Sequence, residues 1–341
     1  MIPLDKNESY WLLDDELVEA ARGFGRMELG TYPDYTALKA ALAAYADVPE
    51  DCILVTPGSD AAIEAIARAY VGKGEAVLPV PTFYGYERIL DRVGSEIVPV
   101  PYESEAGEPE FPLRRTLAAI TAGKPKAVFL CNPNNPLGCG IKDADAARVL
   151  ETASLNDVIT VSDEAYFEYS GRTLLPSLTL KPNLIILRTL SKAFGIPGAR
   201  VGYAIAAPEA VERMQRELLP WPVAHESAAA ALALLGRAEK VKERRDAVIR
   251  MRASFFEALQ ALPNVQTLPT ETNFAFIHVP HAREAAEKLG GLGVRVALGE
   301  DMSRFPEAKS LLVDTLRIAI PSPEDMGGVV DNFAKVFTNI S

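Results

Sequence analysis

Short apolar runs alternate with amphipathic stretches from residue 53 to about residue 187. The runs are rich in β-branched residues, which indicates buried strands, and the stretches between them repeat with the helical period. Strands that alternate with helices favour a largely parallel sheet with helices on both of its faces. The predicted strands are residues 53–55, 76–78, 96–98, 127–130, 158–161 and 184–187, and the predicted helices include residues 61–71, 84–93 and 144–153.

The pattern changes beyond residue 205. Helical stretches at 208–218 and 226–262 come first, then strand patterns at 273–279, 294–296 and 315–320, with helices near 281–289 and 323–338. We therefore predict an α/β fold whose large domain, residues 31–235, holds a mostly parallel mixed sheet flanked by helices. A small α+β domain is expected at residues 236–341. Residues 1–30 have no strand pattern, and we expect them to pack against the small domain.

Composition narrows the class of partner. The chain has 35 Lys and Arg against 46 Asp and Glu, and the net charge of −11 argues against nucleic acid or an anionic membrane as partner. No apolar run approaches membrane-spanning length, and the first residues lack the pattern of a secretory signal. Cys52, Cys131 and Cys139 are odd in number and lack metal-site spacing. We therefore expect a cytoplasmic protein with small-molecule partners, no disulfide and no metal.

Polar residues follow the predicted strands, where ligands gather in open α/β sheets. Residues 56–60 open a helix after the first strand, and its free N–H groups suit a phosphate, although Ser59 could equally cap the helix. Residues 132–138 form a turn rich in proline and asparagine that either holds an amide at a fixed place or is purely structural. Asp163 ends another strand, where a buried acid needs a cation.

Lys192 precedes Arg200 by eight residues just after the strand at 184–187. A lysine whose amine loses its proton near neutral pH is a Schiff-base nucleophile, and arginine is the preferred bidentate partner of phosphate. Taken alone, this segment has an alternative explanation, in which Lys192 and Arg200 are solvated surface residues on either side of a glycine-rich loop. With Asp163 for a ring nitrogen and the turn at 132–138 for a ring hydroxyl, the chain offers a partner to each polar group of pyridoxal phosphate.

These motifs closely resemble the fold type I pyridoxal-phosphate enzymes, specifically the class I/II aminotransferases and most of all the histidinol-phosphate aminotransferase branch. The resemblance covers nearly the whole chain. Its landmarks are residues 4–8, 32–34, 58–60, 81–83, 132–138, 163–166, 189–194, Arg200, 273–274 and 316–318.

The resemblance implies roles for three catalytic residues. Lys192 would bind the cofactor aldehyde covalently and, once released, carry the proton between the substrate α-carbon and the cofactor. Asp163 would keep the pyridine nitrogen protonated, so that the ring accepts electrons. Tyr166, together with Asn135, would hydrogen-bond the ring oxygen, and Phe83 would stack on the ring face.

The remaining cofactor contacts are also implied by the resemblance. The phosphate would be held by Gly58, Ser59, Asp60, Thr189, Ser191 and Arg200, with Asp60 orienting the loop rather than touching the anion. Tyr32 resembles the tyrosine that reaches the cofactor phosphate of the partner subunit, which implies a homodimer. Arg317 matches the arginine that grips the substrate α-carboxylate, a planar fork for a planar anion. Asn7 and Tyr10 would lie at the substrate entrance.

The chain departs from the branch at three places. Asn7-Glu8 is followed by Ser9-Tyr10 instead of Asn-Pro. Ala297 stands where the branch places an arginine for the substrate phosphate, and Arg295, two residues earlier on the same strand face, is either its substitute or an unrelated surface charge. Trp221 and His225 replace smaller polar residues and could favour an aromatic side chain. These departures concern the substrate and leave the reaction class intact.

We therefore expect an aminotransferase that acts on an amino acid or histidinol phosphate and a 2-oxo acid. The alternatives are an aromatic amino acid aminotransferase and an amino-acid-phosphate decarboxylase, because residues 196–198 resemble the threonine-phosphate decarboxylases. A noncatalytic cofactor-binding module ranks lower, since Lys192 is intact and no basic DNA-binding segment precedes the domain. A dinucleotide-dependent dehydrogenase is disfavoured, because no G-x-G-x-x-G follows the first strand.

Overall fold

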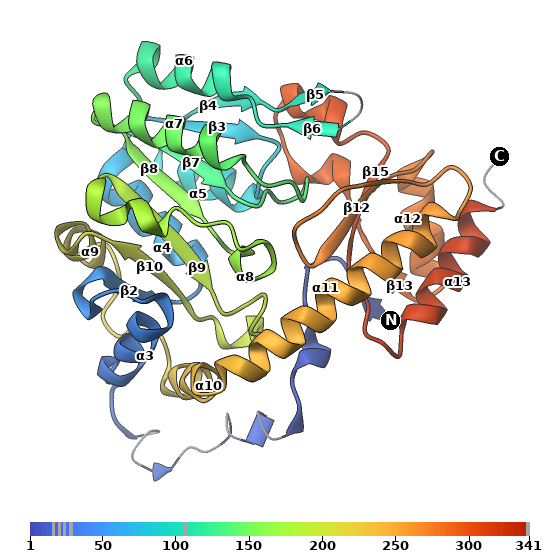
Figure 1. Cartoon of the computed structure of the whole chain (residues 1–341), viewed down its shortest axis with the longest axis horizontal. Helices are drawn as coiled ribbons and strands as arrows, with labels where there is room; N and C mark the ends of the chain where they lie inside the picture. Colours follow the sequence, from blue (N-terminus) through green and yellow to red (C-terminus); the bar gives the residue numbers. More distant parts are fainter. Residues whose placement is uncertain (16–17, 20–21, 23–24, 27–29, 106–107, 339–341) are drawn as a thin grey trace.

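A seven-stranded sheet forms the centre of the larger body of this computed structural model, which describes residues 1–15, 18–19, 22, 25–26, 30–105 and 108–338 (Figure 1). All pairings in this sheet are parallel except those of β10, which runs antiparallel to both of its neighbours. In spatial order the strands are β2 (Ile53–Thr56), β10 (Gly202–Ala206), β9 (Leu184–Thr189), β8 (Ile159–Asp163), β7 (Ala127–Cys131), β3 (Glu75–Val80) and β4 (Glu96–Pro101).

Both faces of this sheet are covered by helices, as the continuous apolar runs predict. Alternate residues of β9 enter different parts of the core: Ile185 and Leu187 pack in one cluster, and Leu184 and Ile186 in another. The flanking helices are α3 (Thr36–Ala46), α4 (Ser59–Ile66), α5 (Tyr84–Val93), α6 (Leu113–Gly123), α7 (Asp143–Leu155), α9 (Pro208–Gln215) and α10 (His225–Leu235). The expected α/β class is confirmed.

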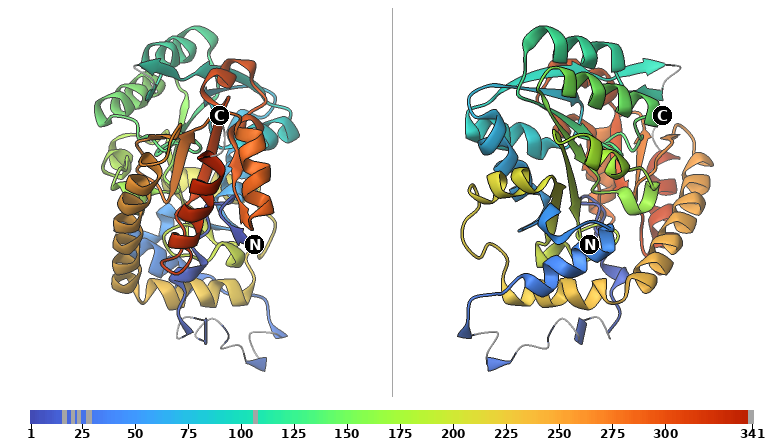
Figure 2. Two further views of the ribbon diagram at one scale, coloured as in Figure 1. Left: turned by 90° about the vertical axis from the view of Figure 1, so that its right-hand side faces the viewer. Right: turned by 60° about the vertical axis from the view of Figure 1, so that its left-hand side comes forward.

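The C-terminal part forms a second body around a four-stranded antiparallel sheet, in the order β11 (Gln266–Leu268), β12 (Phe274–His278), β15 (Thr315–Ala319) and β14 (Ala297–Leu298). Its helices are α11 (Ala238–Gln260), α12 (Ala282–Gly291) and α13 (Met326–Phe337). The long helix α11 runs from α10, beneath the larger body, to the smaller one (Figures 1 and 2). The exact boundaries at residues 30 and 235 stay a prediction.

The N-terminal segment contacts the smaller body, and it does so as a strand. The first thirty residues have no strand pattern in the sequence, yet β1 (Ile2–Pro3) pairs in parallel with β13 (Val294–Arg295). Leu4 extends this pairing, because its N–H donates to Arg295 and its carbonyl accepts from Ala319. Two residues are too short for a recognisable alternation, so only the neighbouring strand reveals the pairing.

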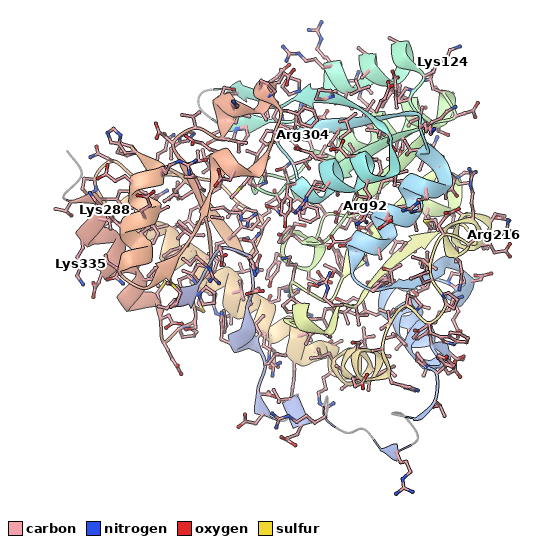
Figure 3. All side chains as sticks on the ribbon, turned by 180° about the vertical axis from the view of Figure 1, so that it is seen from behind. Arg92, Lys124, Arg216, Lys288, Arg304 and Lys335 are labelled. Atoms are coloured by element: carbon pink, nitrogen blue, oxygen red, sulfur yellow. The ribbon has the colours of Figure 1, made fainter. Side chains whose placement is uncertain are left out.

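Arg304 joins the smaller body to the larger one. Its guanidinium contacts Asp91 on α5, with Nη2 and Oδ1 2.7 Å apart, and Figure 3 shows its label between the two bodies. The adjacent Ser303 hydroxyl donates to Glu87 Oε1 at 2.8 Å, and Glu87 is buried. Because α5 begins directly after Phe83, these contacts connect the smaller body to a helix that borders the pocket described next.

Candidate active site

A cavity of about 290 Å³ lies where the two bodies meet. The strand ends of β7, β8 and β9 form one wall, and the N-terminal segment and β15 form the other. Most of the residues singled out from the sequence line it, as strand ends in an open parallel sheet should. These are Asn7, Ser59, Asp60, Phe83, Asn135, Asp163, Tyr166, Thr189, Ser191, Lys192, Arg200 and Arg317.

Lys192 lies three residues beyond the end of β9. Burial and, to a smaller extent, the positive charge of Arg317 lower the pKa of its amine to about 8, while Glu8 and Asp60 act in the opposite direction. The amine donates a hydrogen bond to the carbonyl of Lys6 at 3.3 Å. An amine with a pKa near 8 is partly deprotonated at neutral pH and can attack a carbonyl carbon.

Asp163 is the last residue of β8 and is almost fully buried. The Tyr86 hydroxyl donates to Oδ2, and the N–H of Ala165 donates to Oδ1 at 3.1 Å. Burial raises the pKa of this carboxyl to about 6, although both hydrogen bonds lower it. Within the described part of the chain Asp163 has no ion-pair partner, so a cationic ligand group beside it would stabilise the carboxylate.

The start of α4 and Arg200 form a cradle for an anion. Gly58 adopts φ +79°, which favours glycine, and a Cβ there would lie 2.5 Å from Arg200 Nη2, so a side chain at this position would push the guanidinium aside. Arg200 also pairs with Asp60 at 3.4 Å. The Thr189 and Ser191 hydroxyls lie beside each other, 2.9 Å apart. Helix N–H groups, a guanidinium and two hydroxyls therefore converge.

Arg317 comes from β15 in the smaller body and reaches the cavity from the opposite side. Its Nη1 donates to Asn135 Oδ1 and its Nη2 to the carbonyl of Asp5, each at 2.6 Å. Its Nε has no hydrogen-bond partner among the described residues. Burial lowers the pKa of the guanidinium, so an anionic ligand would stabilise its charge. Nearby, Asn7 Nδ2 donates to the Tyr166 hydroxyl at 3.0 Å.

Several predicted residues lie elsewhere. Tyr32 is exposed and stacks on Trp221 with ring centroids 4.2 Å apart, and neither ring lines the cavity of its own chain. Arg295 also lies outside the cavity wall and pairs with Asp5, its Nε 2.9 Å from Oδ1. His225 starts α10 away from the wall. Tyr10 belongs to the short helix at Tyr10–Leu12, and its side chain lies outside the described residues.

Several other residues at the cavity wall, or directly behind it, have no role predicted from the sequence. Tyr86, which binds Asp163, was detectable because it follows Phe83 by three residues at the start of a helix and so shares its face. Tyr84 and Glu8 also line the cavity. Asp5 and Lys6 belong to the motif at residues 4–8, but their own roles were not predicted.

The arrangement fits pyridoxal phosphate. An amine with a lowered pKa, a buried carboxyl without a cation and a glycine-lined cradle under an arginine stand around one cavity. They match the aldehyde, the pyridine nitrogen and the phosphate of that cofactor. In the described residues no cluster of three or more His, Cys, Asp or Glu side chains could hold a metal ion, and no helix there is long and apolar enough to cross a membrane.

Comparison with known proteins agrees with this geometry. Residues 1–324 match the family "aminotransferase class I and II". A histidinol-phosphate aminotransferase of Caldanaerobacter subterraneus subsp. tengcongensis is 34% identical over 325 residues, which are 94% of this chain and 89% of that protein. An aromatic amino acid aminotransferase of Corynebacterium glutamicum is 33% identical over 88% of this chain and 83% of its own length.

Solved structures share the fold. The crystal structure of histidinol-phosphate aminotransferase from Sinorhizobium meliloti in complex with pyridoxal-5'-phosphate superposes with a TM-score of 0.87 at 23% identity, covering 100% of this chain and 91% of that one. At this identity the likeness establishes the fold, and the family match extends it to the reaction class. The chain therefore belongs to the class I and II aminotransferases and is a pyridoxal-phosphate-dependent aminotransferase.

Proposed function

We propose that this aminotransferase moves an amino group between histidinol phosphate or an amino acid and a 2-oxo acid, with Lys192 as its catalytic base. The observation that carries the proposal is the lowered pKa of the Lys192 amine in a cavity that also holds Asp163 and Arg200. A lysine with a lowered pKa that lay outside a binding cavity would give no support for a catalytic role.

Pyridoxal phosphate, when bound, supplies an electron-poor ring that accepts the electron pair of the substrate α-carbon. Lys192 takes the proton from that carbon and returns it to C4′ of the cofactor, because its amine can hold or release a proton near neutral pH. Asp163 holds the proton on the pyridine nitrogen. The nitrogen cation in turn lowers the pKa of Asp163, since opposite charges favour each other.

The other predicted cofactor contacts bind and orient. Arg200, Ser59, Thr189 and Ser191 bind the phosphate, and Gly58 gives the guanidinium room to approach it. Asp60 pairs with Arg200 and fixes the direction of its guanidinium. Asn135 and Tyr166 orient the ring through its oxygen, and Phe83 covers one ring face.

Arg317 binds the α-carboxylate of an amino acid. Its origin on β15 supports this role, because Arg317 and Arg200 reach the same cavity from different parts of the fold and each guanidinium can take its own anion. A buried arginine with an unpartnered Nε also has an N–H ready for a second carboxylate contact. Asn7 fixes Tyr166 through its amide and closes the cavity next to Arg317.

Different observations support histidinol phosphate and aromatic amino acids as the amino donor. The name of the Caldanaerobacter relative supports histidinol phosphate. Against a phosphate on the substrate stand Ala297, which pairs with Arg317 in the sheet where the branch has an arginine, and Arg295, whose guanidinium already pairs with Asp5. The exposed ring of Tyr84 at the cavity supports aromatic amino acids as the second candidate, in line with the Corynebacterium relative.

A cytoplasmic homodimer is the form we propose for the enzyme. Tyr32 and Trp221 are exposed although both are large aromatic rings, which supports a second copy of the chain covering them. A partner surface would also explain why Tyr32 is absent from the cavity of its own chain. Free thiols at all three cysteines support a reducing compartment. Light scattering of the purified protein would test the dimer.

The decisive experiment is a titration of the cofactor-loaded enzyme with one donor at a time, followed by visible absorbance. Histidinol phosphate, glutamate, and aromatic and aliphatic amino acids form the panel. Conversion of the cofactor to its amino form by a donor, with a 2-oxo product, supports transamination and identifies that donor. Release of carbon dioxide without any requirement for a 2-oxo acid would instead indicate a decarboxylase.

A further inference from the structure

Glu8 has no assigned task in the cavity. Three other acids of the wall are engaged: Asp163 by Tyr86, Asp60 by Arg200 and Asp5 by Arg295. Among the described residues, Glu8 forms no hydrogen bond or ion pair. Glu8 and Lys192 line the same cavity, and the negative charge of Glu8 raises the pKa of the Lys192 amine, which places its carboxylate on the reacting side of the cavity.

The backbone on both sides of Glu8 is fixed. Asn7 and Ser9 are both 1% exposed, whereas Glu8 between them is only partly buried. Asn273 donates to the carbonyl of Asn7 at 3.1 Å and to the Ser9 hydroxyl at 3.2 Å, so the smaller body anchors this stretch. Asn7 has φ 56°, a backbone conformation that few residues other than glycine adopt. The carboxylate of Glu8 is thus presented to the cavity by a rigid segment.

Tyr84 supplies an apolar surface at the same cavity. Tyr84 is 49% exposed although it lines the wall, and Phe83 meets its ring edge to face with centroids 5.2 Å apart. The Arg88 guanidinium also lies near the ring, 6.0 Å from its centroid, and about half of the residue stays open to solvent. An exposed aromatic ring in a binding cavity favours a planar ligand group, which stacks on it at little entropic cost.

From these two observations we propose that Glu8 is a specificity-determining residue, which selects donors whose planar side chain carries an N–H group or a positive charge. The side chain stacks on Tyr84 and donates to the Glu8 carboxylate, while Arg317 holds the carboxylate at the other end. The inference rests on the proposed function, since it assumes that a donor molecule occupies this cavity. It adds a residue and a chemical criterion for the donor.

The test uses two unreactive analogues that lack the amino group, imidazole-4-propionate and 3-phenylpropionate. Both carry the carboxylate for Arg317 and a planar ring, and only the first has a ring N–H and a charge at pH 6. Their dissociation constants are measured by calorimetry with the cofactor-loaded wild type, Glu8→Gln and Lys6→Met. Lys6 also lines the cavity, so its replacement is a matched control that removes the opposite charge.

At pH 6, Glu8→Gln should weaken imidazole-4-propionate about tenfold and leave 3-phenylpropionate within about twofold, as expected for a lost charge-assisted hydrogen bond. The preference of the wild type for the imidazole ring should shrink at pH 8. Lys6→Met should increase the preference for imidazole-4-propionate over 3-phenylpropionate, because it removes a positive charge from the cavity. Equal weakening of both analogues would show that Glu8 acts through Lys192 or the fold and would overturn the proposal, as would no change in either.

The same samples separate this inference from the proposed function. If the wild type discriminates between the analogues through Glu8 yet converts no donor in the absorbance titration, the assignment of transamination fails and the role of Glu8 stands. If donors are converted but Glu8→Gln leaves the ratio of the two dissociation constants unchanged, the role of Glu8 fails and the proposed function stands.

Discussion

The two walls of the cavity are assembled in different ways. The cofactor wall consists of residues at or just after the ends of strands of one sheet, as in Asp163 at the end of β8 and Lys192 shortly after β9. The opposite wall joins residues 5–8 to Arg317, more than 300 residues apart, as in the contact of Arg317 with the Asp5 carbonyl. A local motif can therefore specify the chemistry, whereas selection of the substrate depends on distant segments meeting.

The strongest test of the cofactor wall is Lys192→Ala. Turnover should fall by about 10⁴-fold or more, because the chain then lacks both the nucleophile and the base. Steady-state kinetics and the visible absorbance of the cofactor check it. Lys192→Arg keeps the charge and should be equally inactive, whereas Lys309→Ala, an exposed lysine outside the cavity, should be normal. A Lys192→Ala enzyme with wild-type turnover would remove the basis of the assignment.

Replacement of Arg317 tests the opposite wall. Arg317→Ala should lower kcat/KM for amino acids about 100-fold, since two charge-assisted contacts to a carboxylate disappear. The affinity for pyridoxal phosphate, measured by titration of the cofactor-free chain, should stay within a few fold, because Arg317 is connected to the proposed cofactor contacts only through its hydrogen bond to Asn135. Comparable losses in cofactor affinity and in kcat/KM would mean that the two walls are not separable.

Asp163→Asn tests the cofactor wall through stability. The pKa of Asp163 is raised to about 6 in the folded chain without cofactor, so the folded state holds this proton more tightly than the unfolded state does. Its contribution to stability is complete below the unfolded pKa of about 4 and is lost as pH rises through 6, a change on the order of 3 kcal/mol.

The stability of the Asn variant relative to wild type should therefore increase between pH 4 and pH 7. Urea unfolding of both cofactor-free proteins at several pH values measures it. Asp157→Asn makes the same chemical change at an exposed site and should give a flat difference. A flat difference for Asp163→Asn as well would indicate that its carboxylate is already compensated by a cation.

The smallest effect is expected from Arg295→Ala. The Arg295–Asp5 pair is half exposed, so its loss should cost less than about 1 kcal/mol of stability. Activity toward donors without a phosphate should stay within about twofold. A loss of activity with histidinol phosphate alone would assign Arg295 to the substrate phosphate. The substrate site would then extend beyond the residues that line the cavity.

Much of the fold was predictable because the buried parallel strands are continuous apolar runs. Helix α5 begins and ends at the predicted residues 84 and 93, and the strands at 127 and 184 begin where expected. β10 was not predicted, because its five residues begin with glycine and contain one β-branched side chain, and because its antiparallel direction has no local signature. β1 was likewise invisible without its partner.

The residues of the candidate site also differ in how far the local sequence predicts them. Asp163, Lys192 and Arg200 could be assigned from the sequence because each occupies a strand end or a turn whose chemistry is local. Glu8 and Tyr84 could not, although each directly follows a predicted site residue, because no local pattern shows which side chains of such a loop face the cavity. Tyr32 stays a prediction, because the group it is expected to touch belongs to another copy of the chain.

Strand β10 has a consequence for how the protein is made. It inserts between β2 and β9, and its first residue, Gly202, lies so close to the start of α4 that a Cβ there would be 2.5 Å from the Ser59 nitrogen. The two halves of the phosphate cradle are therefore synthesised about 140 residues apart and meet only when β10 is in place. We therefore expect a nascent chain to bind the cofactor phosphate only after residue 206 has left the ribosome. Cofactor binding would then indicate that the central sheet is complete.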